Sequence, residues 1–94
     1  MNREAQERIV RRLNEKLDRP IAAYTKTDTL PYPANPGHIF IDRHSPGDGW
    51  TRYRLMEMVN EGGGESYWSS ARAMTRTELT AYLQGIASTL EAVS

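Results

Sequence analysis

The sequence contains no cysteine among its 94 residues. Disulfide bonds and thiol chemistry are therefore excluded. Long apolar runs are also absent, and the first residues are charged rather than apolar. A membrane span needs about 20 consecutive apolar residues, and a signal peptide needs an apolar segment near its start. We therefore expect a cytoplasmic protein with no membrane partner.

The chain also has no net charge, because its 12 basic residues balance its 12 acidic residues. Such a chain has no overall field that draws it to nucleic acid or to an anionic membrane. Ten of the 12 cations are arginine, the residue suited to bidentate contacts with carboxylate or phosphate. Codon use in a GC-rich genome produces the same bias, so the arginines alone do not select a partner. The length predicts a single domain spanning residues 1–94.

Residues 2–18 are predicted to form a helix capped by Asn2 and ended by the approach to Pro20. Its expected core face carries four apolar residues at helical spacing: Ala5, Ile9, Leu13 and Leu17. The other faces mix both signs of charge, which is typical of a solvated helix surface.

Residues 75–93 are predicted to form a second helix. Thr75 and Glu78 have the spacing of a capping box, in which each side chain bonds to the backbone of the other residue. A broad apolar stripe follows at helical spacing: Leu79, Tyr82, Leu83, Ile86, Leu90 and Val93. Gly85 interrupts this helix at a cost of about 1 kcal/mol relative to alanine, so we expect close approach of another group there.

Between the helices, residues 20–37 hold four of the five prolines and predict an extended connection. We expect Tyr24, Leu30 and Tyr32 to hold this connection to the body. Residues 38–74 are predicted to form an antiparallel sheet, with strands at 38–44 and 50–60 and a possible third strand after the glycine run. The predicted fold class is therefore α+β, with a C-terminal amphipathic helix packed on the sheet.

Catalytic and metal-binding patterns are missing. His38 and His44 lie about 20 Å apart along a strand, too far to share a metal ion, so Asp42 between them is expected to make ordinary hydrogen bonds. No serine lies in the G-x-S-x-G pattern of a nucleophile elbow. We predict a protein that is not an enzyme and that needs no metal or cofactor.

The run Gly62, Gly63 and Gly64 lies between the second strand and two aromatic residues. It lacks the Gly-Lys-Ser/Thr ending of a P-loop and is too far from the next helix for a dinucleotide fingerprint. Two interpretations remain. The run is either a plain connection between strands, which we favour, or a binding loop whose amides hold an anion.

Three segments together resemble a group of small uncharacterised proteins encoded by bacterial viruses: "ANPGHIFID", "GDGWTRYRLMEMVNEGGG" and "TRTELTAYLQGI". The group shares an N-P-G-x-Y/F-x-I/L-D strand, an N-E-G-G-G run and a final helix ending in G-I. The resemblance spans residues 34–86 and implies an accessory protein in an infected bacterial cell, without a settled activity. The helix–strands–helix order is also similar to double-stranded RNA-binding domains, but Thr75, Arg76, Thr77 and Glu78 replace the lysine cluster of that family.

Two functions lead from these observations. We also expect a homo-oligomer, because the chain is short and both faces of the predicted sheet carry large apolar groups. In the first, the protein sequesters an anionic, nucleotide-derived ligand of host defence signalling. The predicted ligand-binding residues are Trp50, Arg52, Arg54, Gly62, Gly63, Gly64, Tyr67, Trp68 and Arg72. In the second, it is a protein–protein inhibitor of a host complex. Nucleic-acid binding ranks third because the charge is balanced.

Overall fold

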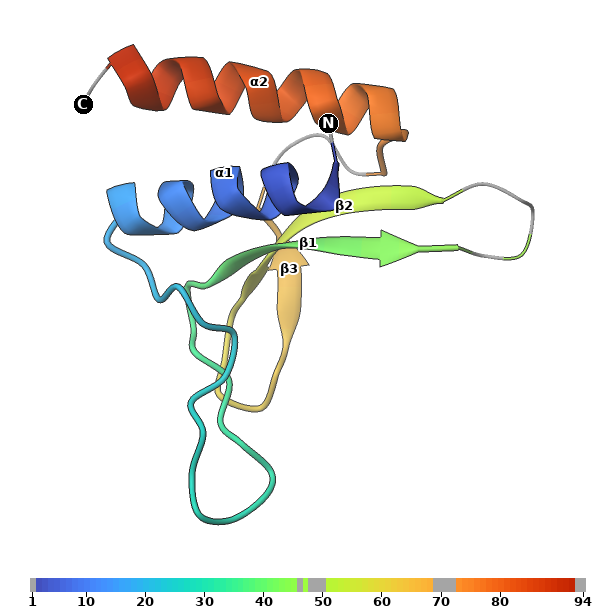
Figure 1. The fold of residues 1–94 in the computed structure, drawn as a ribbon. Helices are drawn as coiled ribbons and strands as arrows, with labels where there is room; N and C mark the ends of the chain where they lie inside the picture. The colour runs from blue at the N-terminus through green and yellow to red at the C-terminus, as the bar shows by residue number, and fades with distance from the viewer. Residues whose placement is uncertain (1, 46, 48–50, 69–72, 93–94) are drawn as a thin grey trace.

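The computed structural model describes residues 2–45, 47, 51–68 and 73–92. A three-stranded antiparallel sheet carries both helices on one side, so the predicted α+β fold is confirmed (Figure 1). The elements in chain order are α1 (Arg3–Lys16), β1 (Ile39–His44), β2 (Arg52–Met58), β3 (Glu65–Tyr67) and α2 (Arg76–Ala92). Their ends lie within one or two residues of the predicted helix and strand ends, except that β3 stops at Tyr67 rather than continuing to residue 74.

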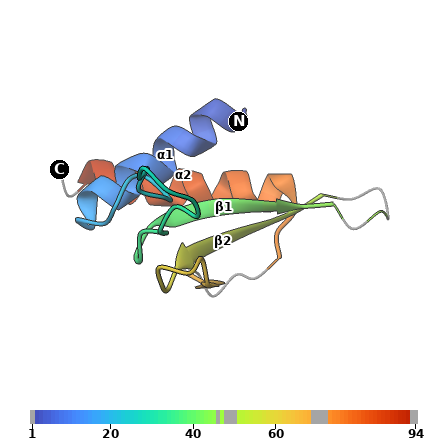
Figure 2. The ribbon, with the colours of Figure 1, turned by 90° about the horizontal axis from the view of Figure 1, so that it is seen from below.

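The sheet has the order β1-β2-β3, which leaves β1 and β3 as its edges. Ile41 lies opposite Leu55, and Asp42 lies opposite Arg54. Because side chains alternate along a strand, these two pairs point to opposite faces of the sheet. Leu55 belongs to the core beneath the helices. Arg54 therefore points to the opposite face of the sheet, which neither helix covers and which we call the open face. Figure 2 shows the sheet with both helices behind it.

The core forms where β1 and β2 meet the two helices. Ile39, Leu55, Leu79 and Leu83 are fully buried and contact one another within a single cluster. Burying such side chains stabilises a fold by about 1.5–3 kcal/mol each. In the stripe predicted for the second helix, Leu79, Leu83 and Leu90 are buried, Tyr82 and Ile86 are partly buried, and Val93 lies outside the described residues.

The core face of α1 differs from the prediction by about one position. Its buried residues are Gln6, Val10, Leu13 and Asn14, whereas Ile9 is partly buried and Leu17 is 46% exposed. Two of these buried residues are polar, so a search for apolar residues alone selects the wrong face. Their side chains bond to β1: Gln6 accepts from Arg43 at 3.0 Å, and Asn14 pairs with the backbone of Ile39.

Both helix starts follow the sequence prediction. The Asn2 side chain accepts a hydrogen bond from Ala5 N at 2.8 Å. At α2, Thr75 and Glu78 form the reciprocal capping box, with distances of 3.0 and 3.2 Å. Four backbone N–H groups at each helix start lack intrahelical partners, and these bonds satisfy some of them.

The end of α1 comes earlier than Pro20 because Asp18 adopts a left-handed conformation with φ of 57°. Asp18 N bonds to Glu15 O, and Arg19 N bonds to Asn14 O at 2.8 Å. This is the Schellman arrangement, which closes a helix and turns the chain away from its axis. The turn sends residues 20–37 outward past the edge of the sheet (Figure 1).

Candidate functional site

The glycine run joins β2 to β3. Val59 N bonds to Gly64 O at 2.9 Å, which closes a four-residue hairpin loop over residues 60–63. Inside the loop, Gly63 N bonds to Asn60 O, and Gly64 N bonds to the Asn60 side chain at 2.9 Å. Two of the three glycine amides are thus engaged within the turn, and an anion would have to displace these bonds to use them.

Each glycine of the run has a different structural requirement. Gly63 has φ of +89°, a conformation that other residues rarely adopt. A Cβ at Gly64 would lie 2.4 Å from the Asn60 side-chain nitrogen, so a larger residue there would have to displace the side chain that accepts a hydrogen bond from Gly64 N. A Cβ at Gly62 would come no closer than 3.3 Å to Asn60. Turn geometry therefore explains Gly63 and Gly64 without a ligand.

Arg54 lies on the open face of the sheet, where its guanidinium is bound to Asp42. The Arg54 Nε donates to Asp42 Oδ2 at 2.9 Å, and Arg54 Nη2 donates to the same oxygen. The hydrogen bond to Asp42, and secondarily that to Tyr67, raises the pKa of Arg54 above its ordinary value. Asp42 therefore has arginine as its partner, and a phosphate at Arg54 would compete with that carboxylate.

The predicted ligand-binding residues are only partly brought together. Tyr67 pairs with Met56 in the register of β2 and β3, which places it on the open face with Arg52 and Arg54. Trp68 packs against the core on the helix side instead. Trp50 and Arg72 lie outside the described residues. Arg54 and Tyr67 thus form one group, while Trp68 and the glycines are placed elsewhere.

Residues 20–37 form a projecting arm. Tyr24 and Ala34 form a β-bridge across the arm, with Thr25 N bonded to Pro33 O at 3.0 Å. Leu30 is 76% exposed, so the prediction that it holds the arm to the body is wrong, whereas Tyr24, although 51% exposed, places its hydroxyl beside Gly63 of the hairpin loop. The small residue Ala34 is buried instead, and its N–H bonds to Glu61 O in the hairpin loop.

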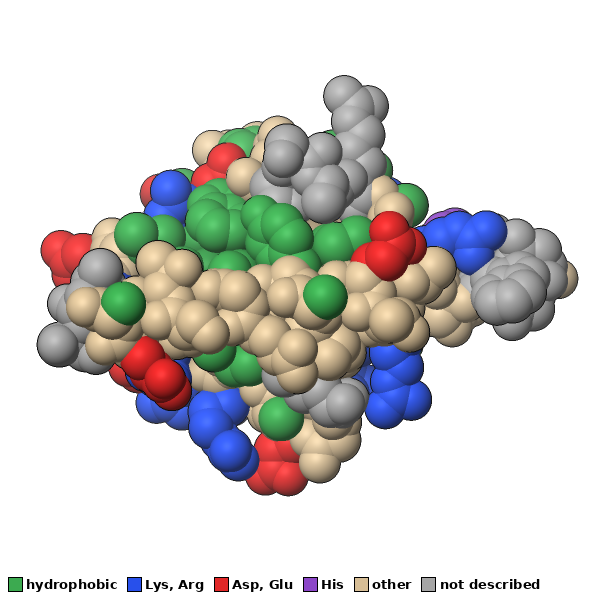
Figure 3. Space-filling model, turned by 90° about the horizontal axis from the view of Figure 1, so that it is seen from above, with side chains coloured by type: hydrophobic (Ala, Val, Ile, Leu, Met, Phe, Trp, Pro, Cys, Tyr) green, Lys and Arg blue, Asp and Glu red, His purple; other side chains and the backbone are tan. Residues whose placement is uncertain are grey.

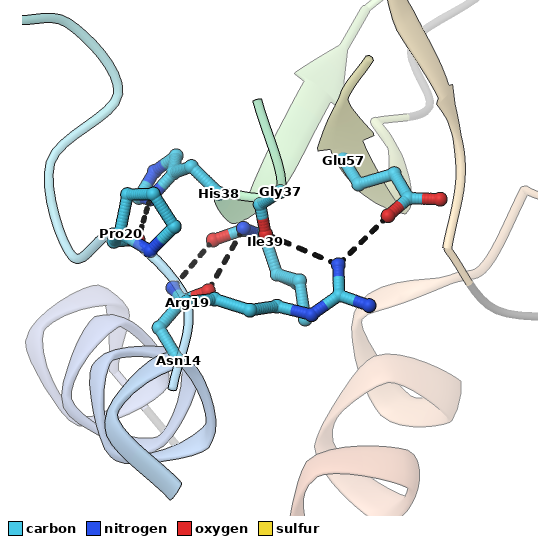
Figure 4. A network of polar contacts seen from close by, with 7 residues as sticks. All are labelled: Asn14, Arg19, Pro20, Gly37, His38, Ile39 and Glu57. Atoms are coloured by element: carbon cyan, nitrogen blue, oxygen red, sulfur yellow. Dashed lines mark hydrogen bonds and ion pairs between the residues drawn. The ribbon is translucent and has the colours of Figure 1, made fainter. Parts of the chain in front are cut away.

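A polar network fixes the base of the arm, where its two chain segments meet (Figure 4). The Arg19 guanidinium donates to Gly37 O at 3.1 Å and to Glu57 at 2.8 Å. His38 Nδ1 lies 2.9 Å from Pro20 O, and since a carbonyl only accepts, this ring nitrogen is the donor. Both segments are therefore tied to each other and to β2.

A second apolar feature lies on the helix side. A groove of about 610 Å³ runs along α2 and reaches the end of α1. Its lining includes Leu17, Trp68, Tyr82, Gly85, Ile86 and Thr89, and we call it the helix groove. Figure 3 shows hydrophobic side chains gathered along one side of α2 on this face. Leu17 and Ile86, both predicted to be core residues, thus contribute to a surface.

Within the described ranges, no group of three or more histidine or acidic residues is placed to hold a metal ion. Among the same residues, no helix has the length and apolar character needed to cross a membrane.

Comparison of the chain with protein-family models, with curated proteins and with solved structures gives no match. The resemblance to small proteins of bacterial viruses stays a hypothesis, and function has to be argued from the surfaces described above.

The sequence analysis selected the arginines and glycines but missed both apolar surfaces, the arm and the helix groove. The distribution of charge along the chain could have indicated them. Residues 20–37 contain only Lys26 and Asp28 as charged residues, and residues 79–90 contain none. The whole chain has 26% charged residues, so two long segments with so little charge indicate apolar surfaces that could contact another molecule.

Proposed function

We propose that this chain is a small, non-enzymatic binding protein that docks on a partner protein by inserting the tip of its arm into an apolar pocket of that partner. The observation that carries the proposal is the exposure of Leu30, at 76%, on an arm whose base is fixed. In the setting implied by the resemblance to proteins of bacterial viruses, the partner would be a host protein.

The shape and chemistry of the tip define the partner. Leu30 and Pro31 together with Tyr24 and Tyr32 form an open, almost entirely apolar surface. The arm contains one lysine and one aspartate, so it carries no net charge. Nucleic acid is a poor match because its binding depends on lysine and arginine at phosphates. A projecting apolar tip with two tyrosines fits a concave apolar pocket on a protein, since tyrosine is enriched at binding hot spots.

The construction of the arm lowers the cost of such binding. Thr25 Oγ1 donates to the Asn35 side chain at 2.7 Å, and Asn35 Nδ2 donates to Ala22 O at 3.0 Å. These bonds and the prolines restrict the arm before any partner arrives. Ordering a flexible segment on binding costs free energy, so a pre-formed arm retains more of its contact energy as affinity.

The nucleotide-derived ligand predicted from the sequence has weaker support. Its best basis is Arg54 beside Tyr67 on the open face, but the Asp42 carboxylate already occupies the guanidinium. If a phosphate binds there, Asp42→Asn should tighten its binding by removing the competing charge, and Arg54→Ala should abolish it.

The decisive experiment is affinity capture of host proteins by wild type and by Leu30→Asp, with identification of the captured protein and titration against it. Burial of a leucine contributes about 1.5–3 kcal/mol, so loss of this contact should weaken binding roughly 10- to 100-fold. Val59→Asp is the matched control, because Val59 is also an exposed apolar residue, at 50%, but lies at the end of β2 rather than at the tip.

Equal affinity of wild type and Leu30→Asp for the captured protein would refute the proposal. Mass spectrometry of small molecules released from the same samples tests the alternative, in which the chain binds a nucleotide-derived ligand. A phosphate-containing compound that is retained by wild type and lost from Arg54→Ala would favour the nucleotide function instead.

A further inference from the structure

We infer that the helix groove and the exposed face of α2 form a two-fold interface with a second copy of this chain. The inference concerns the helix side of the molecule, whereas the arm projects away from the sheet in the other direction (Figure 1). It therefore does not depend on the proposed function of the arm.

Gly85 provides the first observation. It lies inside α2 and is exposed, and a Cβ built there would meet none of the residues that the structure describes within 4 Å. The described part of the monomer therefore gives no packing reason for glycine at a position where alanine would favour the helix. Its φ is not in the left-handed region that would require glycine. Close approach of a group from outside the monomer remains as the physical reason for the missing side chain.

The neighbours of Gly85 suit another helix. Ala81, Gly85 and Thr89 follow one another at intervals of four residues and line the helix groove. Residues at this interval form a ridge, and ridges of this type interlock when two helices cross at about −50°. Small residues along the ridge let the two backbones approach closely, while Tyr82 and Ile86 beside it provide apolar contact area.

The near absence of charge in the groove favours a second copy of this chain as its occupant. Residues 79–90 contain no aspartate, glutamate, lysine or arginine, and Lys16 is the only charged residue among the described residues that line the groove. A two-fold interface places the same patch against itself, so a charged patch would face its own charge. An uncharged patch avoids that repulsion and complements itself.

The position of Gly85 also fits two-fold symmetry. It lies one residue from the midpoint of α2, which spans Arg76–Ala92. If the symmetry axis passes close to Gly85, the two α2 helices cross near their midpoints and each contacts the middle of the other copy's groove. The two arms would then project from opposite ends of the dimer.

The test is sedimentation of the full chain from about 10 to about 200 µM, a range that detects dissociation constants of weak dimers. Wild type should change from the 10.7 kDa monomer toward twice that mass. Gly85→Glu and Ala81→Glu should each weaken the dimer at least about tenfold by placing a charge in the interface. Gln84→Glu is the matched control, because it adds the same charge on the adjacent residue, about 100° around the helix and outside the groove lining.

Circular dichroism of every variant verifies that α2 is intact, and both test positions are exposed in the monomer. Wild type that stays monomeric throughout the range overturns the inference, including the case in which another protein occupies the groove. Dimers of wild-type strength in both Gly85→Glu and Ala81→Glu also overturn it, because the contact would then lie elsewhere.

Discussion

The side chain of Asn14 joins α1 to the outer edge of β1, and its replacement tests how the helix is held to the sheet. Its amide nitrogen donates to Ile39 O, and its oxygen accepts from Ile39 N, both at 2.9 Å. Asn14 is 1% exposed and Ile39 is 0% exposed. The asparagine thus supplies the two bonds that a residue of a neighbouring strand would make at this edge.

Asn14→Leu keeps a side chain of similar size but removes both bonds. The N–H and C=O of Ile39 would remain buried without partners, and each such group costs about 1–3 kcal/mol. The expected loss is therefore about 2–6 kcal/mol from a total stability of about 5–15 kcal/mol. For a chain of this length, that corresponds to a lowering of the melting temperature by roughly 10 °C or more.

Urea unfolding followed by circular dichroism measures this loss, and amide hydrogen exchange of Ile39 reports the local bond. Glu15→Ala is the control because Glu15 is an exposed neighbour on the same helix. A loss below about 0.5 kcal/mol for Asn14→Leu, within the range of ordinary surface substitutions, would show that these bonds do not hold α1.

Three further predictions concern α2 and the glycine loop. Leu83→Ala should destabilise the fold by about 2–5 kcal/mol in urea, since Leu83 is 0% exposed and its truncation leaves a cavity. Gly63→Ala should lower stability by about 1–2 kcal/mol because its φ is +89°, and Gly62→Ala should cost clearly less in the same urea unfolding assay. The hydrogen bond from the Thr75 backbone, and then that from its side chain, lowers the pKa of Glu78. The stabilisation from this bond is present above the unfolded-state pKa of Glu78 and is lost as the pH falls through its lowered folded-state pKa. As the pH falls below the ordinary carboxyl pKa of 4.5, wild type should therefore lose stability relative to Glu78→Gln.

The elements that followed from the sequence are those in which local chemistry and burial agree. In α2, the capping box and the apolar stripe point to the same helix face, and Leu79 and Leu83 are buried as that stripe predicts. The strand pair β1 and β2 likewise follows from β-branched and aromatic residues around strong turn residues. Local preference and tertiary packing reinforce each other in these segments.

The sequence prediction was wrong where a polar side chain is buried or an apolar side chain is exposed. Asn14 is buried because the edge of β1 offers it two partners, which are 25 residues away in the sequence. Leu30 is exposed, and the arm is held by hydrogen bonds of both backbone and side chains rather than by apolar contacts of Leu30. The pairing of Arg54 with Asp42 depends on strand register, which composition does not specify. These features arise from long-range geometry, and a periodicity search has no access to them.

Because the polar network at the base of the arm holds both of its ends, the sequence of the arm can change without a change in the fold. Pro20 and His38 are joined by a hydrogen bond, so the segment between them is a loop whose ends are already held together. Doubling the length of such a loop costs only about 0.6 kcal/mol of closure entropy. Changes at the exposed residues between Thr25 and Pro33 can therefore alter the surface of the arm while α1, the sheet and α2 keep their structure. The rest of the chain then acts as a scaffold for a segment whose length and sequence can vary.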